Sequence, residues 1–394
     1  MDSDRCWELV QAARAAAGPI GDDLGDRLAD ALIGLLAALP PDEIVAFELR
    51  FRQLRGRLAG REDVYAAAFL GEVPAAVMIG EAAVAKRSGR YDPAVGEELL
   101  DDFIRANRER DLGVYGVHVH REGDEDVERR VRSDDRVNLY SVSKTFTSVA
   151  LGIAEAEGRL SLDDRLLDHF PELRPIAADG VEDVTLRHLA TMASGTSHEW
   201  FADMRVDALD LLHEIVAAPL DAVPGTRFAY TDSGPYAIGR VIARATGADV
   251  RDFLMPRLFG PLDLHNPAWH TCPQGFPFAA SDLFLRTGEL ARFARLLLRE
   301  GKWNGRQLVP ADYVRRMTRE FADTSSIIES ERFNHGYGLG VWIDRDGMYR
   351  MDGRYGQYAV ICPTRRAAVT VTAHSEREVD LLEAIHELIL DRLG

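Results

Sequence analysis

Apolar residues with helical spacing mark the first part of the chain. Residues 42–58 follow Pro40-Pro41 and carry one apolar stripe, formed by Ile44, Phe47, Phe51, Leu54 and Leu58. Proline is favoured in the first turn of a helix, and a one-sided stripe is typical of a helix that packs against a partner. Residues 28–36 show similar spacing. We therefore predict a helical module over residues 1–92, with a role in intramolecular packing or protein–protein contact.

The pattern changes after residue 93. An amphipathic helix at 99–108 is followed by segments with strand character, and a second amphipathic helix closes the chain at 381–389. Asp346-Gly347 lies between two of these segments and is a strong signal for a hairpin turn. The expected strands are 113–120, a short strand after Glu122-Gly123-Asp124, 337–343, 348–352, 358–361 and 368–372.

These segments predict the fold of residues 93–394. The strands come from both ends of this region, whereas residues from about 158 to about 300 are rich in helices and loops. We predict an α+β domain in which an antiparallel sheet, assembled from distant segments, is flanked by helices and carries a helical subdomain. The sequence therefore indicates two domains, 1–92 and 93–394.

Composition narrows the classes of partner. The chain has 394 residues and a formal net charge of −17, and its basic residues are scattered. This balance argues against nucleic acids and anionic membranes as partners. No apolar run approaches the roughly 20 residues that cross a bilayer. We therefore expect no membrane partner.

The N-terminal residues and the cysteines predict a cytoplasmic location. Residues 1–8 lack the basic and apolar regions of a signal peptide. Cys6, Cys272 and Cys362 are an odd and unrelated set without a Cys-x-x-Cys motif. Such a set fits a reducing compartment.

Ser141-Val142-Ser143-Lys144 is the segment with the clearest candidate chemistry. Three positions are about one helical turn, so the hydroxyl of Ser141 and the amine of Lys144 are expected on one helix face. A serine hydroxyl becomes a good nucleophile when a neighbouring base takes its proton, and a desolvated lysine can act in this way. Residues 142–153 carry an apolar stripe that would anchor the helix, with Ser148 on the other face.

Residues 139–147 resemble the nucleophile segment of the serine beta-lactamase and penicillin-binding protein superfamily, in particular its class C and esterase-like branch. The resemblance extends over residues 95–394 and includes the segments 184–195, 224–234, 301–305 and 356–358. It implies the fold of that superfamily, with acylation of Ser141 and a part for Lys144 in proton transfer. The N-terminal part resembles a bacterial helical domain of unknown function, through residues 7–9 and 41–44.

The same resemblance places the second catalytic motif at Tyr230. A phenol has a pKa of about 10 in water, and we expect an ammonium at Lys144 to lower it. Asp232 stands where the family usually has asparagine. A carboxylate near Lys144 would stabilise the ammonium, which favours Tyr230 as the base and Lys144 as its electrostatic partner. The alternative is that Asp232 is a solvated turn residue.

The third family motif has two candidates. Arg286-Thr287-Gly288 has suitable chemistry, but an amphipathic helix follows directly and Thr287 is interpreted as its cap. Met351-Asp352-Gly353 lies on a predicted strand where the motif is expected, and we choose it. Gly353 suits a strand against which substrate lies closely. The resemblance then implies an oxyanion hole formed by the backbone N–H groups of Ser141 and Arg354. Met351 replaces the usual Lys or His and cannot bind a substrate carboxylate.

No metal or organic cofactor is implied by the sequence. His118 and His120 share one strand face, but no third ligand is evident, and we interpret them as polar residues of an edge strand. A Gly-x-Ser-x-Gly motif is absent from the sequence, which does not support a nucleophile elbow.

Together these observations predict a serine hydrolase. Ser141 would form an acyl-enzyme with a small ester or amide, and water, an alcohol or an amine would release the acyl group. Esterase, D-aminopeptidase-like, amide hydrolase and acyltransferase activities remain open, and true beta-lactamase activity is disfavoured because Met351 supplies no cation. The alternative is a binding or regulatory protein that has kept the fold without catalysis.

Overall fold

The computed structural model describes residues 93–198, 210–325, 327 and 331–393, together with isolated positions between 5 and 47. The chain divides into two compact units, Met1–Gly96 and Glu97–Gly394. Apart from those isolated positions, the helices expected within residues 1–92 lie outside the described residues. The predicted domain boundary at residues 92 and 93 stays a prediction.

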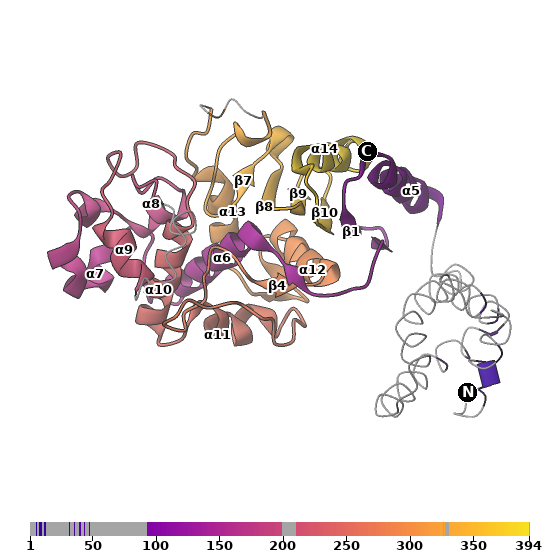
Figure 1. Cartoon of the computed structure of the whole chain (residues 1–394), viewed down its shortest axis with the longest axis horizontal. Coiled ribbons are helices and arrows are strands. Elements are labelled where there is room, and N and C mark those ends of the chain that lie inside the picture. The colour runs from indigo at the N-terminus through magenta and orange to yellow at the C-terminus, as the bar shows by residue number, and fades with distance from the viewer. Residues whose placement is uncertain are drawn as a thin grey trace, which may run out of the picture. The chain divides into compact units, whose positions relative to one another are not determined.

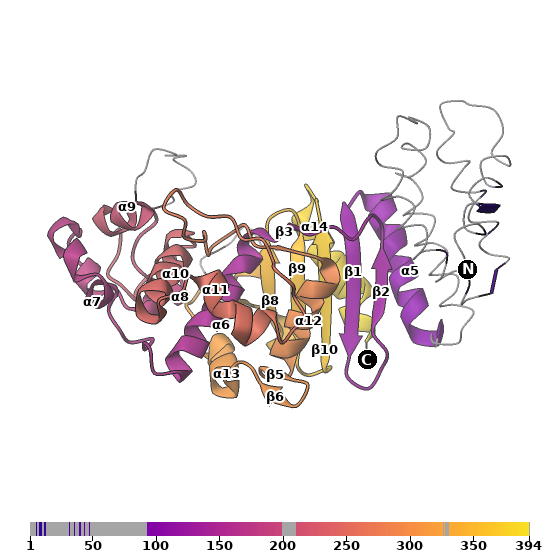
Figure 2. The same cartoon turned by 90° about the horizontal axis from the view of Figure 1, so that it is seen from below.

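Six antiparallel strands form the central sheet of the second unit, as Figure 1 and Figure 2 show. Their order is β2-β1-β10-β9-β8-β7, so the sheet joins strands from both ends of the unit, as the sequence predicted. The expected strand 337–343 is shorter than predicted, because only its last two residues pair with β8. The strands are β1 (Val114–Arg121), β2 (Val127–Arg130), β7 (Trp342–Ile343), β8 (Tyr349–Gly353), β9 (Gln357–Cys362) and β10 (Ala367–Ala373).

Helices cover both faces of this sheet. On one face, α5 (Pro93–Arg110) and α14 (Glu378–Leu388) share an apolar cluster with side chains such as Val117 and Val369. On the other face, α6 (Ser143–Ala156) and α12 (Thr287–Leu298) share a larger cluster with residues of β8 and β9. Side chains alternate between faces along a strand, so each strand contributes to both clusters. This arrangement confirms the predicted α+β class.

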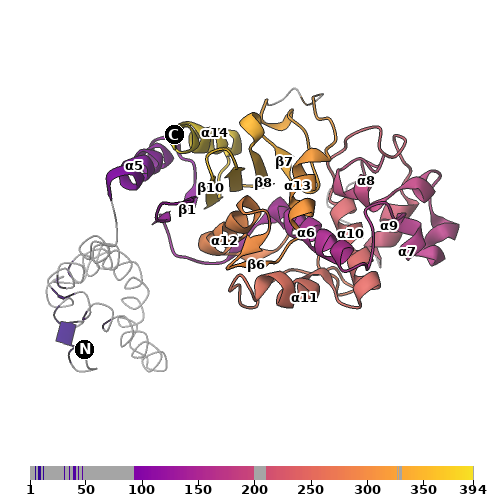
Figure 3. The same ribbon diagram turned by 180° about the vertical axis from the view of Figure 1, so that it is seen from behind.

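The helix-rich region lies at the end of the unit away from β1 (Figure 1 and Figure 3). Its helices include α7 (Leu166–His169), α8 (Leu186–Ala190), α9 (Leu211–Ala217), α10 (Ser233–Thr246) and α11 (Val250–Leu254). A further helix, α13 (Ala311–Arg319), connects this region to the last strands. Among the described residues, no helix combines the length and apolar character needed to cross a bilayer.

Helix α6 is buried on nearly all sides, and its apolar stripe anchors it in the core as the sequence predicted. Phe146 stacks on Phe293 with ring centroids 3.8 Å apart. Ser148, on the face away from the apolar stripe, donates its hydroxyl hydrogen to the carbonyl of Leu339 at 2.7 Å. A helix surrounded by protein needs partners for its polar groups, and α6 finds them in neighbouring backbone. The beginning of α6 is therefore held rigidly in the middle of the unit.

Candidate active site

Ser141 lies in a short 3₁₀ turn, Tyr140–Val142, directly before α6. Tyr140 has a φ of 48°, an uncommon value for a residue with a side chain. Its N–H donates to Asn138 Oδ1 at 2.8 Å, and Asn138 Nδ2 donates to Asp282 at 2.6 Å. Such left-handed positions persist where surrounding contacts hold them, often at functional sites. These contacts fix the backbone that presents the half-buried Ser141.

Lys144 is the central group of the site. Its side chain is 1% exposed, and Nζ lies within bonding distance of three acceptors. These are Ser141 Oγ at 2.8 Å, the Ala280 carbonyl at 3.1 Å and Asp232 Oδ1 at 2.5 Å. An ammonium has three N–H donors and no acceptor. The three contacts therefore match a protonated Lys144.

Asp232 lies immediately before α10, and its side chain is 18% exposed. It faces Lys144 rather than solvent, unlike the turn residue that the sequence left as an alternative. The carboxylate supplies a counter-charge for an ammonium removed from water, and without it that charge would be costly to bury. The site thus joins α6 and α10 through a buried ion pair.

We expect Asp232→Asn to lower the free energy of unfolding by roughly 3 kcal/mol near neutral pH, because a buried ammonium loses its counter-charge. Ester turnover should fall as well, since a neutral amide oxygen holds Lys144 less strongly than the carboxylate does. A matched control is Asp210→Asn, which removes the partner of Arg240 in a similarly buried pair at 2.7 Å. Urea denaturation and ester assays on both variants make the comparison. Unchanged stability and turnover in Asp232→Asn would contradict this role.

Tyr230 lies beside Lys144, with Nζ 4.9 Å from its ring centroid. Its ring stacks on Trp342 at 5.5 Å and 18° and meets Tyr337 edge-on at 5.6 Å. Burial raises the pKa of Tyr337 well above its usual value, so its hydroxyl stays protonated. Tyr230 is only half-buried. Of these two phenols, Tyr230 is the better candidate for proton transfer.

The predicted third motif lies on β8, and Arg354 follows directly after that strand. Met351 is 1% exposed and belongs to the apolar cluster that contains Leu139 and Val142. A side chain at Gly353 would collide with the carbonyl oxygen of Leu139, so this glycine allows β8 to pack against the turn that carries Ser141. The Arg354 side chain is exposed and lies over the Tyr355 ring. An oxyanion role for the Arg354 N–H stays a prediction.

Asp352 lies between Met351 and Gly353 and accepts a hydrogen bond from Arg350 Nε at 3.0 Å. Burial raises the pKa of its carboxyl to about 6, against the opposing effect of the Arg350 charge. The folded protein therefore holds this proton more tightly than the unfolded chain does. Its contribution to stability is present below about pH 4 and is lost as the pH rises to about 6.

We expect the free energy of unfolding of the wild type, relative to Asp352→Asn, to fall by up to about 3 kcal/mol between about pH 4 and about pH 6. Above that range the difference should level off. Urea denaturation of both proteins at several pH values measures the effect. Parallel stability profiles for the two proteins would show that Asp352 does not titrate in this window.

The other motif candidates have structural roles. Thr287 is the first residue of α12 rather than its cap, and its hydroxyl pairs with that of Thr372 on β10 at 2.6 Å. The sequence was also wrong about an edge strand, because β1 lies between β2 and β10. His118 and His120 both lie near Asp126, at 3.5 Å and 2.5 Å. Among the described residues, no group of three potential ligands could hold a metal ion.

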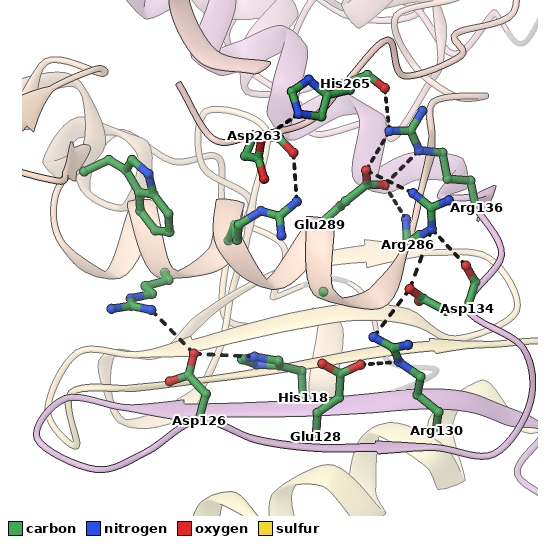
Figure 4. Close-up of a pocket in the computed structure, with 14 residues that line it drawn as sticks. His118, Asp126, Glu128, Arg130, Asp134, Arg136, Asp263, His265, Arg286 and Glu289 are labelled. Atoms are coloured by element: carbon green, nitrogen blue, oxygen red, sulfur yellow. Dashed lines mark hydrogen bonds and ion pairs between the residues drawn. The ribbon is translucent and has the colours of Figure 1, made fainter. Parts of the chain in front are cut away.

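A cavity of about 790 Å³ lies between the β1–β2 hairpin and α12, and Figure 4 shows its lining. Its charged side chains largely pair with one another: Glu128 with Arg130, Asp134 with Arg130 and Arg286, and Glu289 with Arg136. None of the predicted catalytic residues lines it. These ion pairs connect the edge of the sheet to α12.

Sequence reasoning missed several groups that shape the site. The Ala280 carbonyl binds Lys144, yet a backbone carbonyl leaves no signal in the sequence. Trp342 and Tyr337 surround Tyr230, but their spacing suggested only a strand. The glycine-rich stretch around Gly340 packs closely against α6. Only a glycine fits at position 340, because a side chain there would collide with Ser148. The cluster of glycines was the available clue that backbone approaches closely here.

A Ser-x-x-Lys pair at the beginning of a buried helix that packs on an antiparallel sheet is the arrangement of beta-lactamase-like folds. Residues 77–393 match the family model described as Beta-lactamase, and the chain belongs to this family. Residues 1–73 match a model described as a protein of unknown function (DUF4240). Both matches confirm the resemblances inferred from the sequence.

Curated relatives include esterases and beta-lactamases. The lovastatin esterase of Penicillium rubens is 30% identical over 181 residues, which cover 40% of this chain and 44% of that protein. A beta-lactamase of Escherichia coli is 33% identical over 135 residues, covering 34% of this chain and 35% of that protein. The chain thus spans less than half the length of either relative.

Solved structures show the same fold. A putative 6-aminohexanoate-dimer hydrolase from Bacillus anthracis superposes with a TM-score of 0.61 at 18% identity, covering 75% of this chain and 81% of that one. At this identity the likeness establishes the fold alone.

Proposed function

We propose that this protein is a serine hydrolase that forms an acyl-enzyme on Ser141 and cleaves a small ester or amide. The observation that carries the proposal is the position of Lys144 Nζ, 2.8 Å from Ser141 Oγ and held by Asp232 and the Ala280 carbonyl. The family includes esterases among its curated relatives, which agrees with this chemistry. The cytoplasmic location and the role of residues 1–92 stay predictions.

The contacts of Lys144 bear on the identity of the base. A lysine that uses all three N–H groups as donors has no lone pair with which to take the Ser141 proton. Another group must therefore act as the base. The Asp232 carboxylate is the counter-charge of Lys144, so we assign this role to the phenol of Tyr230, whose ring centroid lies 4.9 Å from Nζ. An ammonium beside it favours the phenolate form. Lys144 then acts electrostatically. The sequence predicted this role because an aspartate, Asp232, stands where the family usually has asparagine.

The reaction proceeds in two stages. Tyr230 accepts the proton of Ser141 as Oγ bonds to the substrate carbonyl carbon, and the carbonyl electrons move to oxygen. The tetrahedral intermediate collapses, the bond to the leaving group breaks, and Tyr230 returns its proton to that group. A water molecule then gives a proton to Tyr230 and attacks the acyl carbon. Collapse releases the acid, and Ser141 regains its proton.

The oxyanion of each intermediate needs donors. The predicted donors are the backbone N–H groups of Ser141 and Arg354. The packing of Gly353 against the carbonyl of Leu139 brings the end of β8 to the turn that carries Ser141, which supports this pairing.

Met351 bears on the substrate class. A methionine side chain offers no cation, and Met351 is buried in an apolar cluster. A substrate that depends on a cation at this position to bind its carboxylate is poorly served. The missing cation therefore favours an uncharged ester or amide over a beta-lactam as the substrate.

Burst kinetics with p-nitrophenyl acetate and nitrocefin, measured side by side, test the proposal. We expect a rapid release of about one p-nitrophenolate per protein with the ester, because acylation precedes slower hydrolysis. Nitrocefin should turn over much more slowly. Absence of any ester burst or turnover between about pH 6 and about pH 9 would contradict the proposal and favour a non-catalytic binding protein.

A further inference from the structure

Arg350 on β8 is a charged residue without solvent exposure. Its Nη1 lies 3.2 Å from Asp344, and its Nε lies 3.0 Å from Asp352. Asp344 also contacts His386 Nε2 on α14 at 3.1 Å. Burying these charges is expensive, and apolar residues of the same volume often stabilise a fold equally well. Because the buried charges of Arg350, Asp344 and Asp352 are not needed for stability alone, we expect these residues to have a further role near the site.

The guanidinium of Arg350 faces the aromatic residues around Tyr230. Its Cζ lies 4.9 Å from the Phe333 ring centroid and 5.9 Å from that of Trp342. Trp342 is also the cross-strand partner of Arg350 in the β7–β8 pair. Cations are attracted to ring faces at such distances, and cross-strand neighbours restrict each other. Arg350 therefore fixes the indole of Trp342.

Trp342 in turn contacts Tyr230. The two rings are nearly parallel, at 18° with centroids 5.5 Å apart, and Tyr337 packs edge-on against Trp342 at 4.9 Å. Tyr230 lies on an irregular segment, which is neither helix nor strand. Regular backbone hydrogen bonding does not set the direction of its side chain. The neighbouring rings supply that constraint.

The charge on Arg350 is maintained by its partners. Burial raises the pKa of Asp344, but the hydrogen bond from His386 and the charge of Arg350 outweigh it and hold that pKa below its usual range. Asp344 is therefore a carboxylate at any pH at which the enzyme would work. It anchors Arg350 in the position from which Arg350 contacts Trp342.

We propose that Arg350 and Trp342 are positioning residues, which hold the phenol of Tyr230 beside Lys144 for proton transfer. This inference rests on the proposed function of Tyr230. The contacts form one continuous path from Asp344 through Arg350, Trp342 and Tyr230 to Lys144. Neither positioning residue takes part in bond making.

A double-mutant cycle tests this inference. Arg350→Met keeps the volume of the side chain and removes its charge. We expect it to lower the acylation rate constant with p-nitrophenyl acetate by about 10- to 100-fold, with little change in substrate affinity, because Tyr230 is displaced. In a Tyr230→Phe background the same change should alter the rate by less than about twofold, since the misplaced hydroxyl is already gone.

A matched control is Arg316→Met on α13. Arg316 also pairs with two carboxylates, Glu155 at 2.8 Å and Glu320 at 2.7 Å, and lies near the Tyr313 ring. The Arg316→Met substitution should lower the free energy of unfolding without changing the acylation rate constant of the folded protein. Trp342→Phe is a second test variant with a smaller ring. It should slow acylation when Tyr230 is present and have little effect in the Tyr230→Phe background.

Equal losses in both Tyr230 backgrounds, or wild-type acylation rates in Arg350→Met and Trp342→Phe, would overturn the inference. Failure of the wild-type protein to release p-nitrophenolate would instead overturn the proposed function. The two failures are therefore distinguishable.

Discussion

Replacing Ser141 with alanine is expected to abolish labelling by a fluorophosphonate probe and to lower ester turnover by about 10⁴-fold or more. The variant lacks the hydroxyl oxygen that would attack the carbonyl and that lies 2.8 Å from Lys144 Nζ in the wild type. The side chain is small and half-buried, so the melting temperature should hardly change. In-gel fluorescence, circular dichroism and an ester assay measure the three quantities.

Ser148→Ala is the matched control for this experiment. Ser148 lies on α6, directly after the turn that carries Ser141, but its hydroxyl is buried and donates to the Leu339 carbonyl. This variant should lose about 1 kcal/mol of stability through the missing hydrogen bond and remain labelled by the probe. Persistent labelling of Ser141→Ala would assign the nucleophile to another residue.

Tyr230→Phe is expected to lower turnover by about 10²- to 10⁴-fold, because the phenol hydroxyl that moves protons is lost. The ring remains, so its stacking on Trp342 and its position near Lys144 are kept. Steady-state ester kinetics and thermal unfolding of the variant give the result.

Tyr337→Phe controls for the loss of a neighbouring hydroxyl. Its ring contacts Tyr230, and burial raises the pKa of its phenol well above the usual value, so we expect less than about a tenfold effect on turnover. Near wild-type hydrolysis by Tyr230→Phe would show that the proton-transfer assignment is wrong.

The sequence predicted the fold class because the spacing of apolar residues within a single segment indicates whether that segment is a helix or a strand. Turn and alternation signals indicated the β7–β8 hairpin. The positions of the predicted strands in the chain indicated a sheet that joins strands from both ends of the unit. Periodicity predicted that α6 is anchored in the core, but it did not reveal which groups contact its polar residues. Polar residues such as Ser148 and Thr147 resemble an exposed face until their partners in distant loops are known.

The site was predictable only in part. Helical spacing indicated that Ser141 and Lys144 meet, and chemistry suggested that Asp232 stabilises an ammonium. The left-handed φ of Tyr140 and the contact with the Ala280 carbonyl depend on backbone geometry, which residue types do not encode. Both faces of β8 are covered by distant segments of the chain, so the packing role of Met351 became clear only in the folded chain.

The central claim is that Ser141 carries the acyl group. Intact-protein mass spectrometry after brief exposure to p-nitrophenyl acetate, followed by peptide mapping, tests it most directly. We predict a single acetyl adduct, located on Ser141, which disappears as the substrate is consumed and is absent from Ser141→Ala. Ester turnover without an adduct on Ser141, or an adduct on another residue that explains the turnover, would contradict the account.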